Sequence, residues 1–193
     1  HLSITQTPKW LRNNVAAEEE IVTPLTLDAF HALREKCAVY KIDVFQVSAE
    51  SRRKKLLLAD MDATIVTEET LDELAVHAGL KDEIASITAR AMRGEIDFHD
   101  ALRARVAKLA GLSVSLLGHT LASMTLTAGA RDMVQVMRHN GTTCVLVSGG
   151  FTFFTNAIAD RCGFHHHHGN RLGFDDEGGS LNGDIVEPIL DKD

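Results

Sequence analysis

The sequence predicts an α/β fold: a Rossmann-like parallel sheet interrupted by a helical cap, with a short α+β segment before it. Two short apolar runs, residues 56–59 and 144–147, carry this prediction. Each is long enough for a buried parallel strand, and each stops at polar or small residues. Sequence of helical periodicity lies between them and again after the second run, as in a sheet built from strand–helix–strand units.

Residues 1–54 are expected to form a separate α+β appendage. Leu27, Phe30 and Leu33 are spaced for one face of a helix. Apolar and polar residues then alternate from 39 to 47, which predicts a half-buried strand. A basic stretch at 52–55 marks the boundary with the main domain.

The main domain is expected over residues 55–193, with its first core strand within 55–66. Apolar residues at helical spacing then predict a cap of helices over about 67–124, after which the core resumes over 125–193. Asp97 precedes one of the apolar stripes, so we expect it to be the N-cap of a cap helix.

The part of the core that follows the cap, residues 125–193, repeats the pattern seen at the start of the main domain. Thr127 is predicted to cap a helix that Gly141 ends, and the second apolar run follows. Another helix is expected after Gly150, and the Gly- and Asp-rich tail predicts a hairpin near 177–179. The histidine run 165–168 is interpreted as a solvated loop rather than a metal cluster, because adjacent histidines do not easily converge on one ion.

Composition excludes several classes of function. The formal net charge is −7 without a basic stripe, which argues against nucleic acid as a partner. No apolar run approaches the roughly 20 residues that span a bilayer, so we expect no membrane. Cys37, Cys144 and Cys162 have no metal-ligand spacing, and three free thiols are typical of a cytoplasmic protein.

The sharpest chemical signal is the pair Asp60 and Asp62 directly after the first predicted strand. Ligands bind at the carboxyl ends of strands in such sheets, where one carboxylate can attack phosphorus and the other can carry a proton. The alternative is that the two acids only begin a solvated loop. An EF-hand loop is excluded, because Ile65 and Leu71 occupy the positions that require Gly and Glu.

A second signal, Ser148-Gly149-Gly150, ends the second predicted strand. A hydroxyl and free backbone N–H groups before a helix form an anion site, and glycines let the backbone approach a phosphate. Alone, such a turn is more often structural. Because both strands are parallel, we expect the two motifs to meet at one edge of the sheet.

Three segments in order resemble the phosphoserine phosphatase family of the haloacid dehalogenase-like superfamily. They are KLLLADMDATIVTEETLDELA, ITARAMRGEIDFHDALRARV and LVSGGFTFFT, and the resemblance extends over roughly residues 52–193. It implies hydrolysis of O-phospho-L-serine to L-serine and phosphate, the last step of serine biosynthesis, with Mg²⁺ as cofactor. By this resemblance Asp60 is the nucleophile and Asp62 the general acid/base, both hold the metal, and Ser148 and Gly149 bind phosphate.

The resemblance also assigns residues that read the substrate. Glu69 would meet the ammonium group, and Met92, Phe98 and Arg105 would line the cap side of the site. Phe98 and Arg105 are seven residues apart, so they share nearly one helix face. The fork of an arginine suits a carboxylate, although a snorkelling surface residue is the alternative for Arg105.

The chain departs from the family pattern in two ways. Ala63 occupies a position that is commonly Ser. The family's lysine and final acidic metal ligand are expected beyond Asp193, with Lys192 the candidate lysine inside the chain, so we expect a fragment with little activity alone. Two alternatives stay open: a related enzyme for another small phosphate ester, or an amino-acid-binding regulatory module, since N-terminal extensions in this family resemble regulatory domains. A homodimer also stays open.

Overall fold

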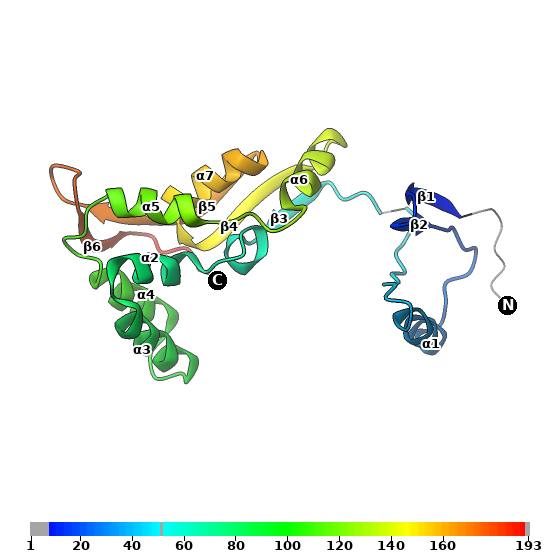
Figure 1. The fold of residues 1–193 in the computed structure, drawn as a ribbon, viewed down its shortest axis with the longest axis horizontal. Helices are drawn as coiled ribbons and strands as arrows, with labels where there is room; N and C mark the ends of the chain where they lie inside the picture. Colours follow the sequence, from blue (N-terminus) through cyan, green and yellow to red (C-terminus); the bar gives the residue numbers. More distant parts are fainter. Residues whose placement is uncertain (1–7, 51, 192–193) are drawn as a thin grey trace. The chain divides into compact units, whose positions relative to one another are not determined.

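The computed structural model describes residues 8–50 and 52–191 (Figure 1). The chain divides into two compact units, residues 1–54 and 55–193, and the division falls within the basic stretch 52–55. Within the described residues, no helix combines the length and apolarity needed to cross a bilayer.

The first unit contains a small hairpin and one helix. Strand β1 (Lys9–Arg12) pairs antiparallel with β2 (Ala16–Glu18), and α1 (Leu27–Ala38) follows. The Thr26 hydroxyl caps α1 by accepting a hydrogen bond from the Ala29 N–H at 3.3 Å. Helix α1 confirms the helix predicted from its apolar spacing, whereas the hairpin was not predicted.

The strand predicted over 39–47 is absent, and this prediction was wrong. Lys41 has a φ of 56°, which interrupts an extended chain, and Tyr40 and Ile42 are exposed. The Gln46 side chain instead binds the backbone of Leu25, accepting from its N–H at 2.8 Å and donating to its carbonyl at 3.3 Å. Alternation predicts a strand only where another strand is available to pair with it.

The second unit is built on a four-stranded sheet in the order β3-β4-β5-β6. Its strands are β3 (Leu56–Ala59), β4 (Thr143–Phe151), β5 (His166–Phe174) and β6 (Leu181–Val186). The first three are parallel, and β6 returns antiparallel beside β5. This arrangement confirms both the parallel sheet and the predicted C-terminal hairpin.

Details of the first two strands differ from prediction. Strand β3 lies at the edge of the sheet, so Leu56 and Leu58 are exposed rather than buried. Strand β4 does not stop at Ser148 but continues to Phe151, with an irregular register against β5 after Val147. The glycines therefore belong to the end of the strand and not to a separate turn.

The histidine run is not a loop, because His166–His168 form the start of β5, although His165, His166 and His168 are exposed. The Nδ1 atom of His165 accepts a hydrogen bond from the Cys144 N–H at 3.0 Å, and His167 Nδ1 lies 2.9 Å from the Thr155 hydroxyl. His166–His168 pair with Val145–Val147 of β4. Histidine has no strong preference for β-strands, so the composition of the run does not predict one.

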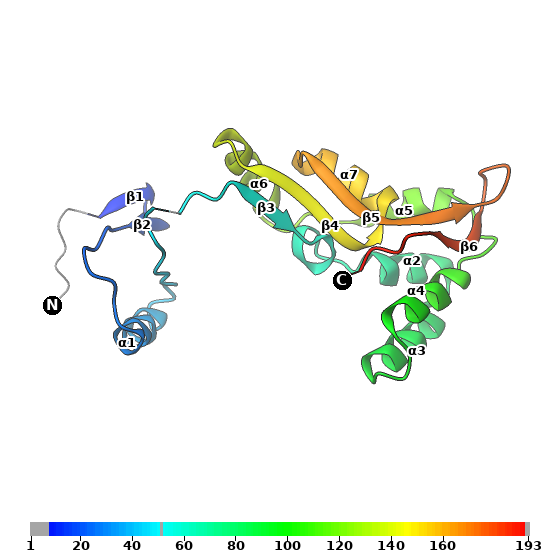
Figure 2. The same cartoon turned by 180° about the vertical axis from the view of Figure 1, so that it is seen from behind.

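The cap consists of α2 (Thr70–Ala78), α3 (Lys81–Met92), α4 (Phe98–Ala107) and α5 (Ser115–Ser123). Asp97 caps α4 as predicted, accepting from the Asp100 N–H at 2.8 Å. In Figure 1, α2, α3 and α4 lie below the strands while α6 and α7 lie above them, and Figure 2 shows the same arrangement from behind.

Helices α6 (Ala130–His139) and α7 (Thr152–Cys162) flank β4 in the chain. The prediction that Thr127 caps α6 is wrong, because Gly129 is the N-cap. The Thr127 carbonyl accepts a hydrogen bond from the Ala130 N–H at 3.0 Å. Gly141, with a φ of 76°, follows the end of α6 as expected.

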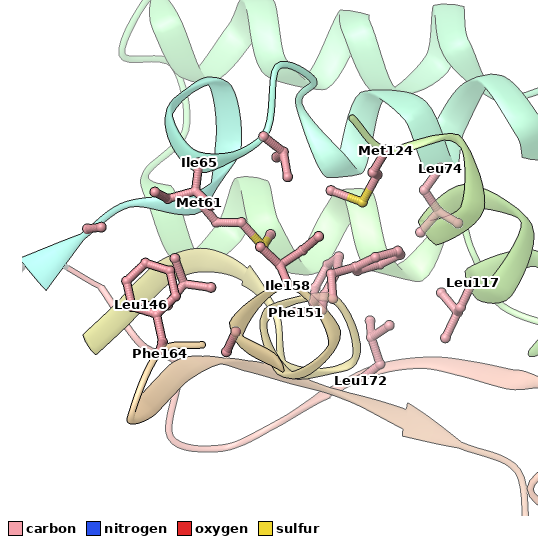
Figure 3. Packing of buried hydrophobic residues seen from close by; sticks show 14 of the residues in the cluster. Met61, Ile65, Leu74, Leu117, Met124, Leu146, Phe151, Ile158, Phe164 and Leu172 are labelled. Carbon is pink, nitrogen blue, oxygen red and sulfur yellow. The ribbon is translucent and has the colours of Figure 1, made fainter. Parts of the chain in front are cut away.

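One hydrophobic cluster joins the sheet to the cap. Figure 3 shows Met61 from the loop after β3 and Leu74 of α2 in the same cluster as Leu117 of α5 and Phe151 and Ile158 from the β4–α7 region. Because cap and core share this cluster, the loop at residues 60–65 is held between two packed layers.

Gly183→Ala should destabilise the chain by about 2–4 kcal/mol, because it adds both backbone strain and a clash. Gly183 has a φ of 86°, and a β-carbon there would lie 2.9 Å from Ala110 Cβ. Gly178→Ala is the matched control, since Gly178 also has a positive φ but no atom within 4 Å of its β-carbon position. Urea unfolding checks this, and equal losses in both variants would exclude the clash.

Candidate active site

The two predicted motifs meet beyond the carboxyl end of β3. Parallel pairing sets Ala59 of β3 opposite Leu146 of β4, so Asp60 and Ser148 follow on neighbouring strands. The Ser148 hydroxyl donates a hydrogen bond to Asp62 Oδ2 at 3.0 Å. The structure thus confirms that the acidic loop and the Ser-Gly-Gly segment share one site.

The acidic loop is a tight turn, Met61–Ile65 (η1), whose ends are fixed by backbone bonds. The Val66 N–H donates to the Met61 carbonyl at 3.0 Å, and the Ala63 N–H donates to the Glu68 carbonyl at 3.0 Å. Asp60 precedes the turn and accepts from the Met61 N–H at 2.8 Å, yet its side chain stays exposed. Asp60 is therefore held in place and still accessible to a substrate.

The Asp62 carboxylate is enclosed by donors. Oδ1 accepts from the Thr70 N–H at 2.8 Å and also from the Thr70 hydroxyl, while Oδ2 accepts from Ser148. Thr70 is buried and is the first residue of α2. Asp62 thus bridges the Ser-Gly-Gly segment and the first cap helix.

Residues 148–150 form a compact polar corner. The Gly150 N–H donates to Ser148 Oγ at 2.8 Å, and a β-carbon at Gly150 would lie 3.2 Å from Asp62 Oδ2. The Asn170 amide donates to the Gly149 carbonyl at 2.8 Å. Glycine at 150 lets the strand approach the acidic loop, and Asn170 fixes the peptide between the two glycines.

Phe98 lies over this corner from the cap. A β-carbon built at Gly149 would lie 3.6 Å from Phe98 Cζ, so α4 covers the end of β4. Phe98 and Arg105 both belong to α4, as the sequence predicted. Met92 ends α3 and is 85% exposed; its role as a substrate contact stays a prediction.

Glu69, the residue before α2, and Arg105 of α4 interact electrostatically. Partial burial raises the pKa of Glu69, the negative charges of Asp62, Asp72 and Asp60 raise it further, and Arg105 opposes them. Desolvation lowers the pKa of the half-buried Arg105, against the attraction of Asp72 and Glu69. An arginine keeps its charge under such conditions, so the cap offers one cation and one acid to a ligand.

The residues that this chain offers to a metal are few but chemically suitable. Within residues 8–50 and 52–191, no three His, Cys, Asp or Glu side chains converge as a metal site. The Asp60 carboxylate and the carbonyl of Asp62 are oxygen donors, the type that Mg²⁺ prefers, and Mg²⁺ commonly takes only one or two protein carboxylates. Lys192, the candidate lysine, lies outside the described residues.

Sequence reasoning missed two site residues, Thr70 and Asn170. Thr70 starts a helix, a position where threonine is common, so nothing in its spacing signalled a bond to Asp62. Asn170 follows a glycine, and a Gly-Asn pair is typical of turns. It is instead a buried residue of β5 whose amide reaches the Gly149 carbonyl.

Curated relatives and solved structures are similar over much of this chain. It is 38% identical over 163 residues to "Phosphoserine phosphatase" of Streptomyces coelicolor, covering 83% of this chain and 39% of the relative. It is 42% identical over 144 residues to the protein of the same name from Archaeoglobus fulgidus, covering 75% and 41%. The chain therefore spans about two fifths of the length of these relatives.

Among solved structures, "Phospho-Aspartyl Intermediate Analogue of Phosphoserine phosphatase" is 36% identical with a TM-score of 0.62, covering 69% of this chain and 63% of that one. "Substrate bound phosphoserine phosphatase complex structure" matches with a TM-score of 0.63 and the same coverage. These matches confirm the resemblance that the three motifs predicted. The family model described as haloacid dehalogenase-like hydrolase matches residues 57–192, which is most of the sequence, and the chain belongs to this family.

Proposed function

We propose that this chain contains the nucleophile, the general acid/base and the substrate-binding cap of a phosphoserine phosphatase. The reaction is hydrolysis of O-phospho-L-serine to L-serine and phosphate, the last step of serine biosynthesis, in the cytoplasm. The observation that carries the proposal is the hydrogen bond between Asp62 and Ser148, which unites the acidic loop with the phosphate-binding segment. The names of the relatives support the choice of substrate.

In the first step a carboxylate oxygen of Asp60 attacks phosphorus, and the bond from phosphorus to the serine oxygen breaks. Asp62, in its protonated form, gives its proton to the departing oxygen, so serine leaves as the neutral alcohol. The Ser148 hydroxyl and the Gly149 N–H donate to phosphoryl oxygens, which stabilises the charge that they carry in the transition state.

In the second step Asp62, now a carboxylate, takes a proton from water as the water oxygen attacks phosphorus. The bond between phosphorus and the Asp60 oxygen breaks, which releases phosphate and regenerates the nucleophile. One residue thus serves as acid and then as base, which suits its place between the cap and the phosphate segment.

Mg²⁺ belongs to this proposal, since phosphoryl transfer gains from a cation that offsets phosphate charge. The Asp60 carboxylate and the Asp62 backbone carbonyl would hold it.

Glu69 and Arg105 would read the amino-acid end of the substrate. An acid for the ammonium group and an arginine for the carboxylate match a zwitterionic headgroup, and the influence of Glu69 and Arg105 on each other's pKa supports this pairing. Phe98 would pack on the substrate's carbon skeleton from above Gly149, with Met92 as a further cap contact.

Double replacement, Glu69→Gln with Arg105→Met, tests this proposal in the complete gene product that contains this sequence. We expect kcat/KM for phosphoserine to fall by about 10²- to 10⁴-fold, the loss of two charge-assisted contacts. Turnover of 4-nitrophenyl phosphate, which has no headgroup, should change less than about 3-fold.

The control is Arg90→Ala: Arg90 is an exposed arginine of the cap that pairs with Glu95, and its loss should leave the turnover of both substrates unaffected. Equal losses on both substrates would instead support an enzyme for another small phosphate ester. Unchanged phosphoserine turnover in the double variant would overturn the substrate assignment.

A further inference from the structure

We propose that Thr70 is a positioning residue that holds Asp62 in the orientation needed for proton transfer and ties it to the cap. This inference rests on the proposed function of Asp62 as general acid/base. Thr70 is 1% exposed, and both its backbone N–H and its hydroxyl donate to one oxygen of Asp62, Oδ1.

The two oxygens of Asp62 therefore have different surroundings. Oδ1 accepts from the N–H and the hydroxyl of Thr70, and Oδ2 accepts from the Ser148 hydroxyl at 3.0 Å. When Ser148 turns its hydroxyl to a phosphoryl oxygen, Oδ2 loses that donor and faces the reacting group, while Oδ1 stays anchored. Thr70 thus determines which oxygen carries the proton and prevents rotation of the carboxylate.

A purely structural role also exists for the same contact. Glu69, the N-cap of α2, makes no side-chain capping bond, so Asp62 caps the helix from the neighbouring loop. That role needs only the backbone N–H of Thr70 and a carboxylate near the helix N-terminus. The hydroxyl is not required for capping. A variant that loses only the hydroxyl therefore tests the positioning role separately from the capping role.

The location of Thr70 connects substrate recognition to the acid. The core and the cap are joined where Val66 bridges Leu126, with the Thr67 N–H donating to the Thr125 carbonyl at 3.0 Å. Thr70 lies just past this junction, immediately after Glu69. A substrate ammonium group held by Glu69 would therefore fix the backbone that orients Asp62.

Thr70→Val removes the hydroxyl and keeps both shape and N–H, whereas Thr70→Ser restores a hydroxyl. In the complete gene product we expect Thr70→Val to lower kcat/KM for phosphoserine by about 10- to 100-fold, within the contribution of general acid catalysis, at an unchanged KM. A nitrophenolate leaves without a proton, so kcat/KM for 4-nitrophenyl phosphate should change less than about 3-fold. Thr70→Ser should recover most of the loss.

Thr120→Val is the matched control, because Thr120 is equally buried and its hydroxyl lies 3.0 Å from Nδ1 of the cap residue His77. It should lower the melting temperature without changing the ratio between the two substrates. If Thr70→Val does not fold, Thr70→Ala removes the same hydroxyl with a smaller side chain.

Equal losses on the alkyl and aryl substrates, or no recovery in Thr70→Ser, would overturn the inference in favour of a structural role. If the wild type hydrolyses another alkyl phosphate but not phosphoserine, the substrate proposal fails, and the Thr70 comparison is made with that alkyl phosphate. A wild type without activity on any phosphate ester would overturn both.

Discussion

Asp60→Asn should reduce phosphoserine hydrolysis on the order of 10⁴-fold or more, as expected when the nucleophile of a covalent mechanism is removed. An amide lacks the negative charge that attacks phosphorus, and it cannot form an acyl phosphate. The side chain is exposed, and it accepts a hydrogen bond from the Met61 N–H, which an Asn oxygen can still accept. The fold should therefore persist while the reaction stops.

Two measurements check this in the complete gene product. Steady-state kinetics gives the loss of kcat, and acid quenching followed by mass spectrometry of the 56–65 region detects the phosphoryl group in the wild type only. Asp82→Asn, in the first turn of α3, is the control acid outside the site and should retain full activity. Retained turnover or phosphorylation in Asp60→Asn would contradict the assigned nucleophile.

The site was largely predictable because its geometry follows from strand order. Two apolar runs that end at Asp60 and Ser148 must bring those residues together once the strands pair in parallel, and they do so through Asp62. Asp97 was predictable for a similar reason, since a cap acts on the three residues that follow it. Such rules concern neighbouring residues or the pairing of two strands, so they can be applied to the sequence alone.

The remaining features depend on tertiary contacts that the local sequence pattern does not reveal. Residues 39–47 alternate like a strand, but without another strand to pair with they stay irregular. The histidine run has the composition of a loop, yet β4 supplies a parallel partner and it becomes β5. Leu58 belongs to an apolar run that predicts a buried strand, but it is exposed because β3 is an edge strand. Tertiary pairing overrides propensity in each case.

Asn170 illustrates the same limit within the site. It is 1% exposed, and its side chain joins three segments: its amide donates to the Gly149 carbonyl at 2.8 Å and to the Leu190 carbonyl at 3.3 Å. Its oxygen accepts from the Leu190 N–H at 2.7 Å. The segment after β6 is thereby fastened beside the polar corner formed by residues 148–150, and in Figure 2 it runs back toward the loop after β3.

Asn170→Ala should destabilise the chain by about 2–4 kcal/mol, since it leaves up to three backbone groups without their partner at a cost of roughly 1–3 kcal/mol for each one that stays buried. Urea unfolding measures the loss. Asn182→Ala is the matched control: Asn182 is exposed, its side chain accepts from the nearby Asp184 N–H at 2.8 Å, and the loss of stability should stay below about 1 kcal/mol.

Asn170→Asp separates the two halves of the contact. Aspartate still accepts from the Leu190 N–H but sets an oxygen against the Gly149 carbonyl, so it should remain destabilised although its shape is unchanged. If Asn170→Asp were as stable as the wild type, the bond to Gly149 would contribute nothing, and the corner that holds Ser148 would have to be fixed by the strand alone. Because the Gly149–Gly150 peptide also donates to Ser148 Oγ, we expect the opposite: the amide of Asn170 orients the peptide, and the peptide orients the hydroxyl.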